Sequence, residues 1–295
     1  MKNTIFTGVA TAIITPLTKD GIDYDKFRSL TEWRIAEGVD AIVVCGTTGE
    51  SSTLSDEEHR AAIKFMVDTV AGRVPVIAGT GSNDTDYACE LTRYACSVGV
   101  DGVLVVTPYY NKATQKGLIA SFQKIADAST KPVILYNVPS RTGVNILPAT
   151  CLELSKHENI VAIKEASGNI SQIAETAALC KGKMDIYSGN DDQVVPVMAL
   201  GGKGVISVVS NVLPEKTARM CRLFREGKIE ESCDIQLELL PLINALFCEV
   251  NPIPVKAAMA AMGFCEDYLR LPLTPMEDAN REKLLGLMRE QGLNV

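Results

Sequence analysis

A lysine at the end of an apolar segment is the first residue whose position in this sequence suggests chemistry. Residues 160–168 read IVAIKEASG, so Lys164 follows a run of apolar residues and precedes a run of small ones. Lysine is rarely buried without a partner, because burial removes its hydration and favours the neutral amine. A neutral amine attacks a ketone to form a Schiff base. Alternatively, Lys164 reaches solvent at the edge of the fold or forms an ion pair with Glu165.

Other polar side chains also follow apolar segments. Tyr136, in YNVPSRTG, is a candidate acid/base, and Arg141, in the same segment, suits two-point binding of a carboxylate. A tyrosine in such a place is more often a packed core residue, and a loop arginine is usually solvated. Thr47 and Thr48 either face a site or only shape a glycine-flanked turn. The full set comprises Thr47 and Thr48 in GTTGES, Tyr109 and Tyr110 in TPYYN, Tyr136, Arg141, Lys164, Gly189 in SGND, and Ile206.

Several remaining motifs favour structural roles. GGKG at 201–204 precedes an apolar segment and predicts a tight turn rather than a phosphate site. The adjacent Asp191 and Asp192 predict helix capping rather than a metal site, because neighbouring side chains on extended backbone point apart. His59 is expected on the surface of a helix. With only two histidines in the chain, a histidine-rich zinc site is not expected, and we predict no metal.

Eight apolar, β-branched segments recur along the chain, and the segments between them have helical spacing. Strands that are apolar throughout are typical of a parallel sheet covered on both faces. A capping box at Ser55–Glu58, and Gly38, Gly72 and Gly99, predict helix ends. We predict an α/β fold, a (β/α)8 TIM barrel, in preference to a doubly wound sheet, which usually has fewer strands. Strands are expected at 8–15, 41–46, 75–80, 102–108, 132–139, 160–166, 185–190 and 204–210.

After residue 211 only helical segments follow. We expect residues 1–226 to form a catalytic barrel domain and residues 227–295 to form a C-terminal helical extension. The active site of such a barrel lies at the C-terminal ends of its strands. The candidate side chains described above would therefore converge on one rim.

The composition narrows the classes of partner and compartment. A net charge of -7 argues against nucleic acid or an anionic membrane surface as a partner. No segment has the ~18 uninterrupted apolar residues that a membrane span needs, and residues 5–14 favour a strand over a signal peptide. The nine cysteines form no C-x-x-C pair, which is typical of reduced thiols. We expect a soluble cytoplasmic protein.

Taken together and in order, the motifs resemble those of the dihydrodipicolinate synthase family. The matching segments are GTTGE, YNVPSRTG, the strand-end lysine in IKEASGN, SGND and GVISVVSN, and the similarity spans nearly the whole chain. This family belongs to the pyruvate-dependent class I aldolases. Its members are lyases that condense pyruvate with L-aspartate 4-semialdehyde in the diaminopimelate route to lysine.

The resemblance implies roles for the catalytic residues. Lys164 would form the Schiff base with C2 of pyruvate, and Tyr136 would be the general acid/base. Thr47 and Tyr110 would link Tyr136 into a proton relay, with Tyr110 reaching the site of a neighbouring subunit. A dimer would then be the smallest active unit, and a homotetramer is common in the family. No cofactor would be required, since the iminium itself is the electron sink.

The resemblance also implies which residues bind the substrates. Thr48 and Ile206 would bind pyruvate, with Gly189 lining the pocket, and Arg141 would hold the carboxylate of the semialdehyde. Sialic acid lyase and keto-deoxy sugar acid aldolases share the lysine and tyrosine but lack the arginine. Arg141 therefore distinguishes the dihydrodipicolinate synthase family from these alternatives. A non-catalytic barrel that senses an oxo acid is a further alternative.

Many relatives are inhibited by lysine, which binds in a cleft at the dimer interface. Lysine-sensitive relatives usually have glutamate at the position of Tyr87, and often histidine at that of Asp56, so feedback inhibition should be weak or absent here. By alignment of the motifs, the residues of this cleft would be Ser51, Ser52, Asp56, His59, Asn83, Tyr87 and Tyr109.

Overall fold

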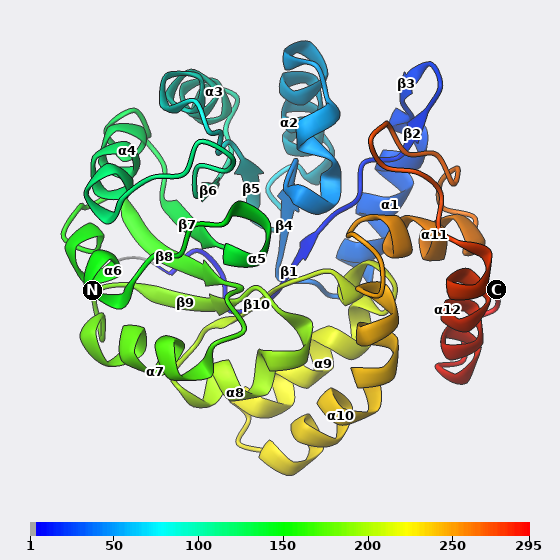
Figure 1. Cartoon of the computed structure of the whole chain (residues 1–295). Coiled ribbons are helices and arrows are strands. Elements are labelled where there is room, and N and C mark those ends of the chain that lie inside the picture. Colours follow the sequence, from blue (N-terminus) through cyan, green and yellow to red (C-terminus); the bar gives the residue numbers. More distant parts are fainter. Residues whose placement is uncertain (1–3) are drawn as a thin grey trace.

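The computed structural model describes residues 4–295 and contains a closed barrel of parallel strands surrounded by helices (Figure 1). Around the barrel the strands follow one another in chain order, and β1 closes the ring by pairing with β10 on one side and β4 on the other. The predicted TIM barrel is confirmed. Its strands are β1 (Gly8–Ala12), β4 (Ala41–Val44), β5 (Val76–Gly79), β6 (Gly102–Val106), β7 (Val133–Asn137), β8 (Ile160–Glu165), β9 (Asp185–Ser188) and β10 (Gly204–Ser207).

Most strands are buried on both faces, which explains why their sequences are largely apolar. Successive side chains of a strand point to opposite sides. In β8, Ala162 belongs to the cluster inside the barrel, whereas Ile163 belongs to the larger cluster between the strands and the helices. Lys164 therefore points into the barrel, on the same side as Ala162, and Glu165 points outward.

The helices begin and end where local signals predict. Ser55 and Glu58 form the predicted capping box at the start of α2. Gly38, Gly72 and Gly99 follow the ends of helices with positive φ, which glycine adopts without strain. The helices of the barrel layer are α1 (Tyr24–Ala36), α2 (Asp56–Val70), α3 (Thr85–Ser97), α4 (Gln115–Asp127), α5 (Pro139–Thr142), α6 (Pro148–Leu154), α7 (Ile170–Leu179), α8 (Val194–Ala199) and α9 (Pro214–Arg225).

Some local features differ from the prediction. The first strand ends at Ala12 rather than at residue 15, because the Ile14 N–H donates to the Asn211 side chain instead of to a strand. A two-stranded hairpin of β2 (Leu17–Thr18) and β3 (Gly21–Ile22) was not predicted. Short 3-10 helices follow several strands, namely η1 (Thr47–Gly49), η2 (Ser51–Thr53), η3 (Asp191–Gln193) and η4 (Val209–Asn211).

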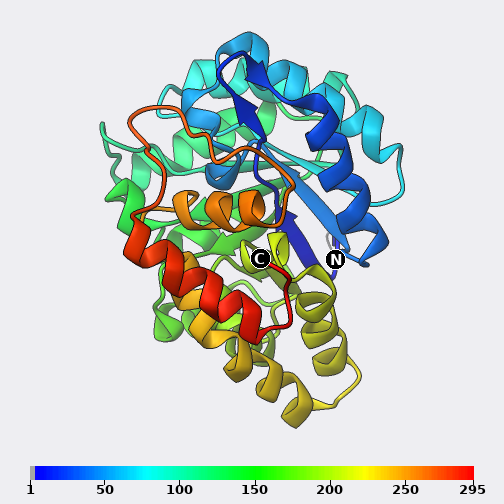
Figure 2. The ribbon, with the colours of Figure 1, turned by 90° about the vertical axis from the view of Figure 1, so that its right-hand side faces the viewer.

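Three helices follow α9, namely α10 (Ile229–Leu246), α11 (Ile253–Ala261) and α12 (Asp278–Glu290). Figure 2 shows α12 in red and α11 in orange at the outside of the barrel, where α12 packs against α10 and α11. The predicted division of the chain after residue 226 falls in the turn between α9 and α10, and it stays a prediction. No helix among residues 4–295 is long and apolar enough to cross a membrane.

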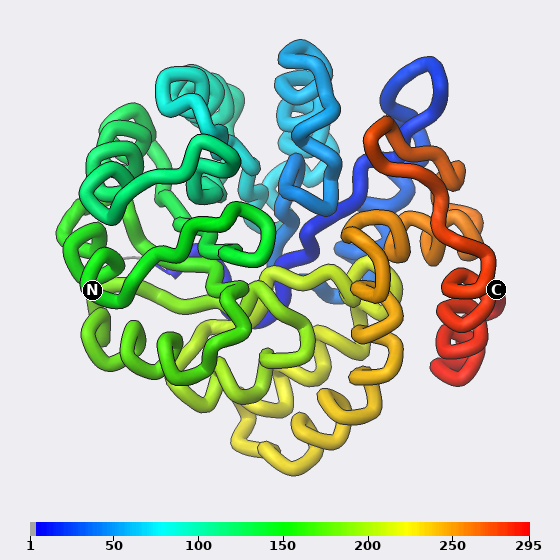
Figure 3. Tube along the Cα trace, viewed as in Figure 1, coloured from blue at the N-terminus to red at the C-terminus, as the bar shows by residue number. Residues whose placement is uncertain are grey.

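The end of the chain returns to its beginning. The trace in Figure 3 places α11 and the segment after it next to α1. Lys26 Nζ donates to the Gly263 carbonyl at 2.8 Å, and Trp33 stacks on Phe264 with ring centroids 4.6 Å apart. The extension is thus fixed against the N-terminal part of the barrel, close to the loop that carries Thr47 and Thr48.

Candidate active site

Lys164 and Tyr136 face each other inside the barrel. They are register partners on the neighbouring strands β8 and β7, near the carboxyl ends of both. Lys164 is 5% exposed, and its Nζ lies 4.3 Å from the centroid of the Tyr136 ring. The structure therefore excludes the alternative in which Lys164 reaches solvent. It places an amine beside a phenol in a largely apolar interior.

Gly189 leaves the space that the Lys164 side chain occupies. A Cβ at position 189 would lie 3.1 Å from Lys164 Cε and 2.7 Å from Ala166 Cβ, closer than packing allows. Ile206 is fully buried in the same inner cluster. Gly189 thus borders the Lys164 side chain and Ile206 lies in the inner cluster of the barrel, while their roles toward pyruvate stay predictions.

Glu165 does not pair with Lys164, so that alternative is wrong. Its carboxylate lies on the outer side of the sheet and accepts from Asn137 Nδ2 at 2.9 and 3.2 Å and from the Ser167 N–H at 3.0 Å. Burial raises the pKa of Glu165 above its ordinary value. Because Asn137 and Glu165 are the register pair next to Tyr136 and Lys164, this contact holds the two strands in alignment behind the reactive pair.

Two cavities with shared lining residues lie near Tyr136 and Arg141. Thr47 and Tyr136 both line a small cavity of about 40 Å³. Thr47 and Arg141 both line a larger cavity of about 380 Å³, which also includes Val138 and Thr142. The larger volume suits a small organic substrate. The structure thus brings Thr47, Tyr136 and Arg141 around two adjacent cavities that share Thr47 in their linings.

Arg141 lies on the short helix α5, which begins with Pro139 and ends before Gly143 at φ 68°. Its side chain is exposed at the cavity, where one guanidinium nitrogen, Nη2, donates to the Asn251 carbonyl at 3.2 Å. A guanidinium has further donors, so Arg141 retains the capacity to bind a carboxylate from the cavity.

Tyr110 lies outside both cavities. It is 91% exposed and has a positive φ of 69°. Residues held in a strained backbone conformation cluster at functional sites, so the exposure of this aromatic side chain points to a partner outside its own chain. Within one chain, the structure does not bring Tyr110 to Tyr136.

Five of the seven residues expected in a regulatory cleft line the larger cavity. They are Ser51, Ser52, His59, Tyr87 and Tyr109. Asp56 lies beside it, and its carboxylate already accepts from the Tyr87 hydroxyl at 2.9 Å and from Arg60 Nε at 2.7 Å. Burial and Asp56 raise the pKa of Tyr87 to about 12. The carbonyl of Asn83 accepts from Asn111, and Asn83 does not line the cavity.

The expectation of a surface role for His59 is wrong. His59 is buried, and its Nε2 lies 2.9 Å from the Gly79 carbonyl oxygen. Burial lowers the pKa of His59, because the charged ring would lose its hydration. The neutral imidazole therefore donates to Gly79, and His59 links α2 to the end of β5.

Asp191 also differs from expectation. It does not cap its own helix; instead its buried Oδ2 accepts from the backbone N–H groups of Val208 and Val209, each at 2.9 Å. Burial raises its pKa. Asp191 thus ties the loop after β9 to the loop after β10. Among residues 4–295, no group of three or more His, Cys, Asp or Glu side chains is arranged to hold a metal ion.

The sequence did not reveal the residues that hold the site from the C-terminal side. Asn251 contacts both Thr48 and Arg141, and Lys256 forms a buried ion pair with Glu50. Burial lowers the pKa of Lys256, and the Glu50 carboxylate opposes that effect. The sequence carries one signal for this pair, a lysine within the mostly apolar helix VKAAMAAMG.

Comparison with known proteins identifies the chemistry that this arrangement serves. The sequence profile described as the Dihydrodipicolinate synthetase family matches residues 5–291. The chain belongs to this family. Members of this family are lyases or synthases of the class I aldolase type, so the chain is an enzyme that uses a lysine Schiff base.

Individual relatives agree with this assignment. A 4-hydroxy-tetrahydrodipicolinate synthase from Thermoanaerobacter sp. (strain X514) is 56% identical, with 98% of each chain covered. The crystal structure of dihydrodipicolinate synthase from Aquifex aeolicus has a TM-score of 0.96 at 45% identity, covering 98% of this chain and 99% of that one. The enzyme from Acinetobacter baumannii, complexed with pyruvate, has a TM-score of 0.96 at 43% identity, with coverage of 98% and 99%.

Proposed function

We propose that the chain condenses pyruvate with L-aspartate 4-semialdehyde, as 4-hydroxy-tetrahydrodipicolinate synthase in the diaminopimelate route to lysine. The observation that carries the proposal is the position of Lys164, buried beside Tyr136 in space that Gly189 leaves open. The pyruvate complex of the Acinetobacter baumannii relative supports the first substrate. Arg141, at the mouth of the larger cavity, supports a second substrate that carries a carboxylate.

The reaction begins at the Lys164 amine, which adds to C2 of pyruvate and releases water to form an iminium. Loss of a proton from C3 gives an enamine, whose C3 attacks the aldehyde carbon while the aldehyde oxygen takes a proton. The amino group of the semialdehyde then displaces Lys164 from C2, which closes the ring and frees the enzyme. Tyr136 is placed to move protons in these steps, with Thr47 across the small cavity as its relay partner.

The complete relay requires a second subunit. Because Tyr110 is 91% exposed and lies outside the cavities of its own chain, we place its hydroxyl in the site of a neighbouring copy. The smallest active unit is then a dimer, and we propose a homotetramer built from two such dimers.

The chemistry requires no cofactor or metal, since the iminium withdraws the electrons that the enamine step needs. We also place the enzyme in the cytoplasm. No disulfide joins any of the nine cysteines, all of which lie among residues 4–295, and this fits a reducing compartment.

Reductive trapping tests the proposal. Incubation with pyruvate and borohydride should add one reduced pyruvyl group to the peptide that contains Lys164, with or without a chelator. Lys164→Arg, which keeps the charge, should remain unlabelled and inactive. Labelling of another lysine, or activity lost on chelation, contradicts the mechanism. Cleavage of sialic acid in place of condensation would favour the alternative aldolases.

A further inference from the structure

Asn251, from the C-terminal extension, contacts both substrate-binding elements of the site. It lies just before α11, and the residue is 5% exposed. Its Nδ2 donates to Thr48 Oγ1 at 3.1 Å, and its backbone carbonyl accepts from Arg141 Nη2 at 3.2 Å. Thr48 and Arg141 belong to different loops, after β4 and β7. One residue of the extension therefore joins the two.

The direction of the hydrogen bond between Asn251 and Thr48 has a chemical consequence. An amide NH₂ group only donates, so the Thr48 oxygen is the acceptor. The hydroxyl hydrogen is left free, and in the described part of the chain the Thr48 side chain has no other hydrogen bond. Thr48 is 3% exposed, so few other groups compete for that hydrogen. A hydroxyl held in this way is a ready donor to an anion.

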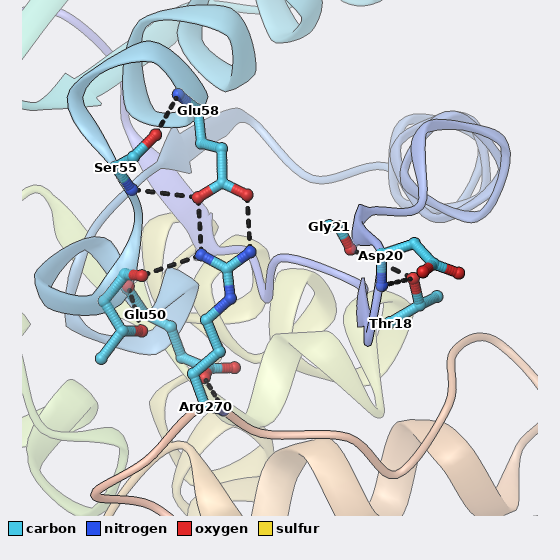
Figure 4. A network of polar contacts seen from close by, with 8 residues as sticks. Thr18, Asp20, Gly21, Glu50, Ser55, Glu58 and Arg270 are labelled. Atoms are coloured by element: carbon cyan, nitrogen blue, oxygen red, sulfur yellow. Dashed lines mark hydrogen bonds and ion pairs between the residues drawn. The ribbon is translucent and has the colours of Figure 1, made fainter.

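The extension holds the Thr48 loop at two further points. Lys256, on α11, forms an ion pair with Glu50 in which both side chains are almost completely buried. Arg270 binds both carboxylate oxygens of Glu58, each at 2.5 Å, and the Thr53 carbonyl at 2.8 Å (Figure 4). Contacts from one element to several points of a loop fix its geometry. Asn251 therefore acts from a rigid support.

We propose that Asn251 is a positioning residue, which turns the Thr48 hydroxyl into a donor for the carboxylate of pyruvate and holds Arg141 at the larger cavity, which Thr47, the neighbour of Thr48, also lines. The inference rests on the proposed use of pyruvate. Asn251 does not touch the reacting carbon atoms, so its effect should appear in pyruvate binding rather than in the chemical step.

Two substitutions of similar size separate this role from simple packing. Asn251→Leu removes the donor, and the KM for pyruvate should rise about tenfold while kcat at saturation stays within about threefold. Asn251→Asp places a carboxylate, which only accepts, next to Thr48. The hydroxyl would then donate to the introduced carboxylate instead of to pyruvate, and the KM should rise by about 100-fold.

A double-mutant cycle tests whether Asn251 acts through the hydroxyl. Thr48→Val removes the hydroxyl and keeps the shape, and in that background Asn251→Leu should raise the KM no further. Lys26→Met is the matched control, because it removes another contact of the extension, the one to the Gly263 carbonyl, without touching the Thr48 loop. It should lower the Tm and leave the KM for pyruvate within about threefold.

The outcomes are distinguishable. A KM for pyruvate that is unchanged in Asn251→Leu, additive effects in the cycle, or an equal rise in Lys26→Met would overturn the inference. A wild-type level of activity in Asn251→Asp would also overturn it, because the amide oxygen would then face Thr48. If wild-type enzyme is not trapped by pyruvate and borohydride, the proposed function itself fails. If trapping succeeds and the KM values do not change, only the role of Asn251 fails.

Discussion

The Nζ of Lys164 lies 4.3 Å from the centre of the Tyr136 ring, across a register pair of β8 and β7. The two side chains enter the barrel from adjacent strands at the same level. Their separation is set by the sheet itself, and the Asn137–Glu165 contact on the outer side prevents the strands from sliding. A reactive amine and its acid/base partner are thus preorganised by strand pairing rather than by a mobile loop.

Removing only the Tyr136 hydroxyl should lower activity while leaving the fold intact. Tyr136→Phe keeps the ring above which Lys164 lies, so the packing is unchanged. General acid–base catalysis typically contributes 10²–10⁴-fold, and kcat should fall by about that factor. Steady-state kinetics with both substrates measures the loss.

Tyr187→Phe is the matched control for this change. Its hydroxyl is also buried in the barrel and donates to the Phe6 carbonyl at 2.7 Å, away from the candidate cavities. It should lower the free energy of unfolding by about 0.5–1.5 kcal/mol and leave kcat nearly unchanged. Equal losses of kcat in the two variants would contradict the catalytic role of Tyr136.

Arg141→Ala should affect the second substrate selectively. Loss of a two-point carboxylate partner costs about 2–4 kcal/mol, or roughly 30- to 1000-fold in activity with the semialdehyde. Trapping of pyruvate on Lys164 should largely survive. Arg141→Lys keeps the charge but not the planar fork, so its activity should be intermediate. If pyruvate trapping failed while semialdehyde binding stayed intact, Arg141 would serve pyruvate, and its proposed role toward the semialdehyde would be wrong.

Two inactive variants should restore each other if Tyr110 acts in a neighbouring site. Lys164→Ala and Tyr110→Ala chains, mixed and allowed to exchange subunits, form hybrids in which one site has both residues intact. Activity should rise well above the sum of the separate proteins. No gain after confirmed exchange would show that Tyr110 acts within its own chain, or not at all.

L-Lysine should inhibit weakly. The carboxylate of Asp56 is occupied by Tyr87 and Arg60, so it is not free to bind an amino group in the larger cavity. Tyr87 also replaces the glutamate of lysine-sensitive relatives. Losing that one charge-assisted partner of the lysine amino group costs about 1.5–3 kcal/mol, or one to two powers of ten in affinity for lysine. An inhibition curve should give half-inhibition above ~1 mM. Tyr87→Glu should bind lysine more tightly, and a potent effect on wild type would refute the prediction.

His59 should make the fold sensitive to mild acid. Its pKa lies below the ordinary value of 6.5, mainly because of burial, so the unfolded chain binds the proton more tightly. The stabilisation is fully present above about pH 6.5 and is lost as the pH falls through the window below it. The Tm of wild type should drop between pH 7 and 5 more than that of His59→Gln, whose amide can still donate to Gly79. If the curves of Tm against pH were parallel for wild type and His59→Gln, His59 would not be the cause of the sensitivity to acid.

The sequence predicted what depends on local patterns. The eight strands were recognisable because most of them are apolar runs that alternate with helical segments, whereas β2 and β3, with two residues each, are too short to show any period. His59 was predicted to lie on the surface, although the spacing of its helix indicates a buried position. His59, Ala62, Ile63 and Met66 follow helical spacing and form one buried face of α2. The face of the helix on which a histidine lies is therefore a better guide to its burial than its polarity.

Long-range contacts could not be predicted in the same way. Asn251 and Thr48 are separated by 203 positions, and Lys256 and Glu50 by 206. No local pattern links such pairs, because only the folded extension brings them together. That the strand-end residues come together was easier to predict, because the carboxyl ends of parallel strands in a barrel meet at one rim regardless of their distance in the chain.

The contacts from the extension to the Thr48 loop determine the order in which parts of the site can form during synthesis. The last barrel strand ends at Ser207, so a ribosome that has released this strand has already delivered Tyr136, Lys164 and the rest of the ring. Chains fold from the N-terminus during synthesis, and the barrel can begin to close at that stage. Asn251 and Arg270 emerge only later. The growing chain therefore carries its reactive lysine before it has the residues that hold the Thr48 loop, and that loop gains these contacts only after residues 251–270 have been synthesised.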